Sequence, residues 1–145
     1  MPATMKTLNY ISRCQAMYRK KTISAENLCS NHYTFVLAVC YKPGRSQDEL
    51  ARALCLDKST VARTLAHLEK YGYITRFPNE KDRRQYLVHP TAKMLELYPK
   101  VQLANREWNT RLTENVSPEE LEAFHRVLSM MERNAKKITD ELEVH

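Results

Sequence analysis

The 145-residue chain has only two glycines, Gly44 and Gly72. Dinucleotide-binding and P-loop motifs both need several closely spaced glycines, so neither is present. The six prolines are spread out, which excludes a proline-rich tract. No apolar run approaches the roughly 18 residues of a membrane-spanning helix. No apolar core follows the first charged residues, so we expect no signal peptide and no membrane partner.

Cysteine pairs at metal-binding or redox spacing are also missing. The four cysteines contain no C-x-x-C, which excludes a zinc ribbon or a thioredoxin-like motif. The five histidines show no H-x-x-x-H and no His/Cys pairing at ligand spacing, so we expect no metal and no cofactor. The sequence shows neither a nucleophile and base at catalytic spacing nor a pair of carboxylates, so we do not expect an enzyme. Without an export signal, reduced thiols in the cytoplasm are expected.

The whole chain has a net charge of +6, and the positive charge is concentrated in its first two thirds. Residues 1–41 carry five basic and one acidic side chain, and residues 42–93 carry 11 and six. Residues 94–145 carry seven basic and ten acidic side chains. A basic module joined to an acidic helical segment indicates a polyanion partner for the first and a protein partner for the second. A solvated surface with a modest positive excess is the alternative.

The C-terminal third shows the strongest helical periodicity. Ser117, Pro118 and Glu120 form a capping box that predicts a helix start. The apolar positions that follow recur in alternating steps of three and four: Leu121, Phe124, Leu128, Met131, Ala135, Ile138 and Leu142. The preceding segment repeats in nearly the same way: Met94, Leu97, Val101, Ala104, Trp108, Leu112 and Val116.

Two helices of about 25 residues, each about 35–40 Å long, cannot both bury such seams within so small a domain. We therefore predict that a second copy of the chain covers them; packing on the chain's own core is the alternative. Pro99 is expected to bend the first of these helices.

Two further helices are predicted in the N-terminal part. The pattern of Leu8, Ile11 and Tyr18 indicates a helix over residues 4–22. Ser30 is expected to cap a second helix that runs to Tyr41.

The middle of the chain predicts a helix-turn-helix followed by a β-hairpin. Ser46 and Glu49 form a capping box, and Asp57 caps a second helix over residues 58–71. Gly72 supplies the positive φ that ends that helix. Residues 73–77 and 85–89 are predicted strands around a polar turn. This order, helix, turn, helix, strand, loop, strand, is that of a winged helix-turn-helix.

The second helix of the pair carries a polar surface near its start. With Val61, Leu65 and Leu68 facing inward, the outward residues are Lys58, Ser59, Thr60 and Arg63, with His67 one turn further on. Hydroxyl groups can bond phosphates or base edges, and arginine can bind guanine through two bonds. A helix of this width fits the major groove. An ordinary solvated helix face is the alternative.

The predicted hairpin turn is densely basic, with Lys81, Asp82, Arg83 and Arg84. Such a turn serves no core, and its charges gain most from a phosphate backbone or a narrow minor groove. Asp82 is placed to hold an arginine in one rotamer.

The chain resembles the MarR (multiple antibiotic resistance regulator) family along essentially its whole length. The most specific element is the Asp-x-Arg of Asp82 and Arg84 between two strands. The resemblance implies a homodimeric winged-helix transcriptional regulator that binds a pseudo-palindromic DNA operator. It further implies that Arg84 enters the minor groove beside Asp82, while Ser59, Thr60 and Arg63 face the major groove. The other matching stretches are residues 46–51, 56–63, 68–76 and 88–93.

The predicted fold is therefore mainly α with a small β-hairpin wing, a winged helix-turn-helix with N- and C-terminal dimerisation helices. We expect an N-terminal dimerisation helix and connection (1–29), a DNA-binding lobe (30–93) and C-terminal dimerisation helices (94–145). The leading hypothesis is a cytoplasmic repressor released by a small molecule. A winged-helix protein-interaction module without DNA binding is the alternative, because fold does not fix function.

Family members commonly respond to aromatic or phenolic ligands or to thiol oxidants. Residues that could line a ligand cleft are Tyr10, Arg13, Met17, His32 and Tyr33, with Arg13 pairing a carboxylate; core packing and solvation are the alternative. Thiol sensing requires an exposed, reactive cysteine. Cys14 and Cys29 are the candidates, whereas Cys40 and Cys55 fall on apolar positions and are expected to pack inside.

Overall fold

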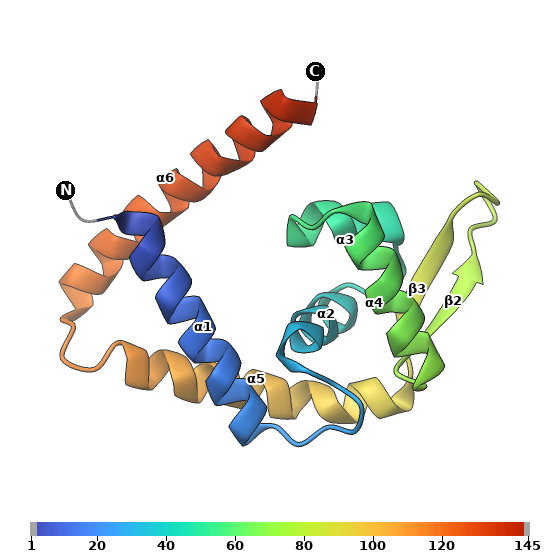
Figure 1. Cartoon of the computed structure of the whole chain (residues 1–145), viewed down its shortest axis with the longest axis horizontal. Coiled ribbons are helices and arrows are strands. Elements are labelled where there is room, and N and C mark those ends of the chain that lie inside the picture. The colour runs from blue at the N-terminus through green and yellow to red at the C-terminus, as the bar shows by residue number, and fades with distance from the viewer. Residues whose placement is uncertain (1–2, 144–145) are drawn as a thin grey trace. The chain divides into compact units, whose positions relative to one another are not determined.

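Six helices and three short strands make up the fold of residues 3–143, the part of the chain that the computed structural model describes (Figure 1). None of these helices is long and apolar enough to cross a bilayer. The elements are α1 (Thr4–Thr22), α2 (Ser30–Tyr41), β1 (Arg45–Ser46), α3 (Gln47–Leu54), α4 (Lys58–Lys70), β2 (Ile74–Pro78), β3 (Tyr86–Pro90), α5 (Ala92–Leu112) and α6 (Pro118–Glu143).

Side-chain caps define the starts of three helices, as the sequence predicted. The backbone N–H of Glu49 donates to Ser46 Oγ at 3.2 Å, and that of Thr60 donates to Asp57 Oδ1 at 2.8 Å. The start of α6 is a reciprocal capping box, in which Glu120 N donates to Ser117 Oγ at 3.1 Å and Ser117 N donates to Glu120 Oε2 at 2.9 Å. Each bond satisfies a backbone N–H group that the start of the helix leaves unpaired.

The start of α2 differs from the prediction. Cys29, not Ser30, is the N-cap, and Ser30 is the first helical residue. The backbone N–H of Cys29 donates to His32 Nδ1 at 3.0 Å. The imidazole thus takes the part that Glu or Gln plays in an ordinary capping box, which is why the sequence pattern did not reveal it.

The wing is a three-stranded antiparallel sheet in the order β1-β3-β2. The predicted hairpin of β2 and β3 is confirmed, with Phe77 opposite Leu87 in the register. The third strand, β1, was not predicted. Its two residues pair Arg45 with Val88 and Ser46 with Leu87. A strand this short has no alternation of apolar and polar residues to reveal it.

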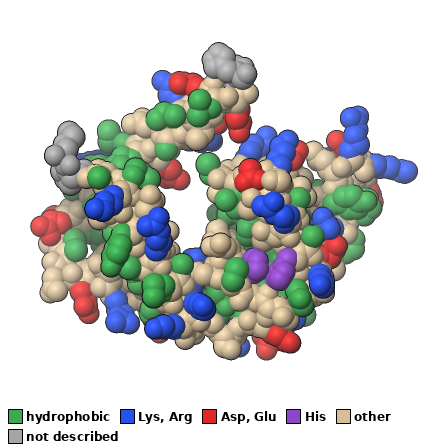
Figure 2. Space-filling model, in the orientation of Figure 1, with side chains coloured by type: hydrophobic (Ala, Val, Ile, Leu, Met, Phe, Trp, Pro, Cys, Tyr) green, Lys and Arg blue, Asp and Glu red, His purple; other side chains and the backbone are tan. Residues whose placement is uncertain are grey.

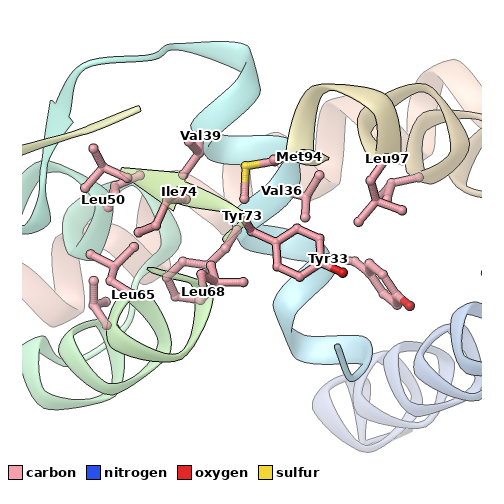
Figure 3. Close-up of a cluster of buried hydrophobic side chains, with 14 of the residues drawn as sticks. Tyr33, Val36, Val39, Leu50, Leu65, Leu68, Tyr73, Ile74, Met94 and Leu97 are labelled. Atoms are coloured by element: carbon pink, nitrogen blue, oxygen red, sulfur yellow. The ribbon is translucent and has the colours of Figure 1, made fainter. Parts of the chain in front are cut away.

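The hydrophobic core lies where α2, α3 and α4 pack against the base of the sheet and the start of α5 (Figure 3). The predicted inward residues of α4 are all fully buried. Met94 and Leu97 bring α5 into the same cluster. The labelled members are Tyr33, Val36, Val39, Leu50, Leu65, Leu68, Tyr73, Ile74, Met94 and Leu97.

Helix α1 is tied to α5 by polar and aromatic contacts. Arg19 Nε donates to Asn105 Oδ1 at 3.1 Å. The ring of Tyr18 lies 5.4 Å from that of Trp108, centroid to centroid. Pro99 lies inside α5, and the helix continues past it to Leu112.

The residues after Trp108 form a separate compact unit. No residue of α6 is buried. The predicted seam of this helix remains open, with Phe124 50%, Ile138 59% and Leu142 72% exposed.

The prediction that Cys55 packs inside was wrong. Cys55 ends α3 in the left-handed conformation, with φ 51°, and it is exposed. The tight turn into Leu56, whose N–H donates to Ala51 O at 3.0 Å, fixes this backbone and directs the thiol outward.

Candidate DNA-binding surface

The start of α4 is an exposed cluster of polar groups centred on Asp57. Besides capping the helix, the Asp57 carboxylate accepts hydrogen bonds from Ser59 Oγ and Thr60 Oγ1, each at 2.6 Å. The bonds from Ser59 and then Thr60 hold the pKa of Asp57 far below its usual range. The carboxylate is therefore charged at all physiological pH values.

This arrangement determines what the two hydroxyls can offer to a ligand. A carboxylate only accepts, so the hydroxyl protons of Ser59 and Thr60 are both committed to Asp57. Each oxygen can still accept, although Thr60 Oγ1 already accepts one hydrogen bond from Arg63. In this state Ser59 and Thr60 suit the amino groups of adenine or cytosine, which donate in the major groove, better than phosphate oxygens.

Two cations flank these hydroxyls. Arg63 Nη2 donates to Thr60 Oγ1 at 3.3 Å, which leaves its other guanidinium donors for a ligand. Lys58 Nζ lies 3.7 Å from Asp48 Oδ1, and 77% of its side chain is exposed. An exposed pair of this kind contributes little to stability, so Lys58 can exchange its partner for a phosphate at small cost.

His67, predicted on the same surface, instead turns toward the protein. Its Nε2 lies 2.7 Å from the carbonyl oxygen of Asn27, in the connection between α1 and α2. Its ring stacks on His32 and contacts Tyr71. The structure therefore brings together Lys58, Ser59, Thr60 and Arg63, but not His67.

The tip of the wing, residues 79–85, is a structured turn that presents basic side chains. Lys81 N donates to Asn79 Oδ1 at 3.0 Å, and Gln85 N donates to Asp82 O at 3.0 Å. Lys81, Arg83 and Arg84 are exposed there. Figure 2 shows Lys and Arg side chains at this tip.

Asp82 holds Arg84 at two points. Its Oδ1 accepts from Arg84 N at 3.1 Å and lies 3.8 Å from Arg84 Nε. The Arg84 side chain is 95% exposed, so it projects into solvent. This geometry restricts the backbone and the base of the side chain while leaving the guanidinium free to enter a groove.

An ion pair that the sequence pattern did not predict links the wing to α4. Arg76 Nε and Nη2, in β2, donate to the two carboxylate oxygens of Glu69, in α4, at 3.1 and 3.0 Å. The bonds from Arg76 lower the pKa of Glu69. A two-bond pair fixes orientation as well as distance. The only signal in the sequence is opposite charges on either side of the helix-ending Gly72.

The residues predicted to line an effector cleft lie on two helices, with Tyr10, Arg13 and Met17 on α1 and His32 and Tyr33 on α2. Tyr33 is a core residue, 2% exposed, whose hydroxyl donates to Ile23 O at 3.4 Å. Tyr10, Arg13 and Met17 are exposed along α1. Within residues 3–143, no hydrogen bond, ion pair or ring contact joins one of the five predicted cleft residues to another.

The four cysteines are free thiols. Cys29 is exposed and Cys14 partly so, whereas burial raises the pKa of Cys40 to about 11. Cys40 therefore acts as a packing residue, as predicted.

Comparisons with known proteins agree on one family. The MarR family model matches residues 35–86. A MarR transcriptional regulator from Methanosarcina mazei Go1 is 30% identical, with a TM-score of 0.85, over 93% of this chain and 97% of that one. The HTH-type transcriptional regulator BilQ of Clostridium symbiosum is 28% identical over 79% of this chain and 80% of its own length.

A Listeria monocytogenes protein assigned to the MarR family and solved in complex with 26mer DNA shares the fold. Its TM-score is 0.87 at 23% identity, over 94% of this chain and 91% of that one. The matched relatives are transcriptional regulators and not enzymes. Together with the winged helix-turn-helix described above, these matches show that the chain belongs to the MarR family of transcriptional regulators.

Proposed function

We propose that this protein is a homodimeric regulator that binds a pseudo-palindromic DNA operator in the cytoplasm and represses transcription until a small molecule releases it. One observation carries the proposal: a polar, capped helix start and an exposed, carboxylate-held arginine project from the same compact lobe. The DNA complex of the structurally similar Listeria protein supports this reading of the fold.

In this proposal, α4 enters the major groove and the wing reaches the adjacent minor groove. Arg63 contacts base edges, and Ser59 and Thr60 accept from base amino groups. Arg84 inserts into the minor groove, where narrow A·T-rich segments have the most negative potential. The phosphate contacts fall to Lys58, Lys81 and Arg83.

The proposed second copy covers the open seam of α6. A monomer with Phe124, Ile138 and Leu142 in water exposes a continuous apolar stripe, which soluble proteins seldom leave uncovered. A two-fold pair of lobes would match a pseudo-palindrome whose half-sites lie about one helical turn apart.

The experiment is a footprint and gel-shift series on the DNA upstream of the gene. Arg84→Ala is expected to weaken binding across sequences, because the minor-groove contact is largely electrostatic. Arg63→Ala is expected to cost about 1–3 kcal/mol at one base pair and to relax the preference there. The salt dependence of each variant separates these two effects.

Lys100→Ala is the matched control, since Lys100 is exposed on α5 and lies outside the proposed surface. It should bind like the wild type. Footprinted operator DNA that both arginine variants bind with wild-type affinity would contradict the site.

The effector part of the proposal rests on α1. Tyr10, Arg13 and Met17 are exposed and share one helix face by their spacing of three and four. An aromatic ring, a cation and a thioether suit an aromatic acid. Repeating the footprint with phenolic acids, and separately with thiol oxidants, distinguishes the two classes of signal; Cys14 and Cys29 are the thiols to follow.

A further inference from the structure

Two histidines stack where the start of α2 meets α4. The ring centroids of His32 and His67 lie 4.6 Å apart, with an interplanar angle of 24°. The other neighbour of His67 is Tyr71, 4.7 Å away. Figure 2 shows histidine side chains meeting at the surface of this lobe. Neither histidine has a place in the proposed DNA contacts.

Hydrogen bonds fix the protonation state in which this arrangement is stable. Because Cys29 N–H donates to His32 Nδ1 at 3.0 Å, that nitrogen must carry no proton. A second proton on His32 would therefore break the capping box of α2. His67 Nε2 faces a carbonyl oxygen and so carries a proton in either charge state. His32 is accordingly the acid-sensitive member of the pair.

The surroundings do not compensate a positive charge. Facing His32 are His67 and the Cys29 thiol, whose sulfur lies 3.9 Å from His32 Nε2. Around His67 are Tyr71 and Lys70, whose Nζ lies over the Tyr71 ring. Within residues 3–143 no carboxylate forms an ion pair with either imidazole. In the same region Tyr33 interacts with the side chains of Tyr73 and Cys29, and Tyr73 interacts with Glu26. Glu69, the carboxylate of α4, pairs with Arg76.

Protonation is therefore disfavoured in the folded chain. Burial, and then the neighbouring His67, lower the pKa of His32. The unfolded chain binds a proton near pH 6.5, so it gains relative stability as the pH falls through that value. The stacked arrangement is thus stable at neutral pH and weakened by mild acid.

The pair also joins two parts of the lobe that differ in role. The carbonyl of Asn27 binds His67, and that of Glu26 accepts from the Tyr73 hydroxyl at 2.7 Å. These bonds attach the α1–α2 connection to α4 and to the base of the wing. Arg63 lies one helical turn before His67, so the attachment is close to the surface that would read DNA.

We propose that His32, His67 and the Asn27 carbonyl form a histidine clasp that positions α4 for DNA binding and opens when His32 is protonated, so that mild acid weakens operator binding. The inference rests on the proposed DNA-binding function. His67 is a positioning residue in this scheme. DNA binding favours the closed clasp and protonation of His32 favours the open one. Protonation therefore weakens DNA binding, and bound DNA disfavours protonation.

The sign of the effect separates the clasp from ordinary titration. Histidines that merely gain charge on acidification strengthen binding to a polyanion. The clasp predicts the reverse. If the pKa of His32 is about one unit lower in the DNA complex than in the free protein, each clasp weakens binding by up to about fivefold between pH 7.5 and pH 5.5.

The test measures binding to the footprinted operator over this pH range at constant ionic strength. The double variant His32→Asn with His67→Gln keeps an acceptor and a donor where the imidazole nitrogens stand, but neither residue titrates. It should lose the acid weakening. His125→Gln, an exposed histidine of α6, is the matched control and should retain the wild-type profile.

An unchanged pH profile in the double variant would overturn the clasp. A wild-type chain that binds no operator at pH 7.5 would instead overturn the proposed function. A histidine NMR titration of the wild type tests the clasp without any variant: His32 should titrate below 6.5, and an ordinary or higher value would refute the inference. If the double variant does not fold, His32→Asn alone replaces it, because it removes the imidazole whose protonation opens the clasp and keeps an acceptor for Cys29 N–H.

Discussion

At the scale of single residues, Asp57 shows how one side chain can serve both stability and recognition. It caps α4 and also orients the hydroxyls of Ser59 and Thr60. A bare cap needs only one acceptor, as Ser46 provides for α3. The capping oxygen of Asp57, Oδ1, also binds the Ser59 hydroxyl, and Oδ2 binds that of Thr60, so the cap also determines which hydrogen-bonding groups the surface presents.

Asp57→Ala is therefore expected to lower the melting temperature and to weaken DNA binding together. Asp57→Asn should be intermediate, because one amide oxygen still caps the helix. The lowered pKa of Asp57 adds a pH signature. Its stabilisation is complete above the unfolded value of about 3.9 and declines as the pH falls below that value toward the lowered folded pKa.

Thermal unfolding of wild type and Asp57→Asn between pH 6 and pH 3 measures this signature. The difference between the two proteins should shrink in the acid part of the range. A difference that grows there would show that the carboxylate does not stabilise the helix through its charged form. Glu49→Gln, at an exposed position in the first turn of α3, controls for the loss of one carboxylate.

At the scale of elements, local signals predicted helices better than strands. Side-chain caps predicted the starts of α3 and α6, and apolar spacing predicted the extent of α1, because both signals are local in the sequence. The strand β1 depends on pairing with a segment some forty residues away, which no local pattern encodes. The predicted strands β2 and β3 are each displaced by one residue, as is usual for element ends.

Some residues of the candidate site could likewise be predicted from local sequence patterns, and others could not. The positions of Ser59, Thr60 and Arg63 at the start of α4 follow from the period of that helix, and that of Arg84 follows from the polar turn between two strands. Both are local signals. The position of His67 could not be predicted, since its partners His32 and Asn27 come from a distant segment. The burial of Tyr33 could not be predicted either, because an aromatic residue on a helix does not reveal how deeply its neighbours bury it.

The packing of α4 gives a prediction at the element scale. Leu65 is fully buried between the helix and the sheet. Leu65→Ala should reduce the free energy of unfolding by about 2–5 kcal/mol, because it removes apolar contacts and leaves a cavity. Urea unfolding at one protein concentration measures the change. Leu95→Ala, at a position 51% exposed, should cost no more than about 0.5 kcal/mol; equal losses would mean that α4 is not packed as described.

At the scale of the whole molecule, α6 is difficult to explain in a single chain. It is the longest helix described and has no buried residue, yet its apolar positions keep a regular seam. Its charged residues occupy the remaining faces. A helix with one unburied apolar stripe is stable chiefly when another helix covers that stripe.

Placing a charge on this seam should therefore separate the proposed dimer. Ile138→Glu is expected to give a single-copy species in sedimentation equilibrium, because a carboxylate cannot be buried between apolar faces without a partner. DNA affinity should fall with it, since one lobe loses the contacts of the second half-site. Ser129→Glu adds the same charge on the opposite side of α6 and should leave both the mass and the affinity unchanged. A wild-type chain that sediments as a single copy, or an Ile138→Glu protein that stays paired, would show that the seam has another use.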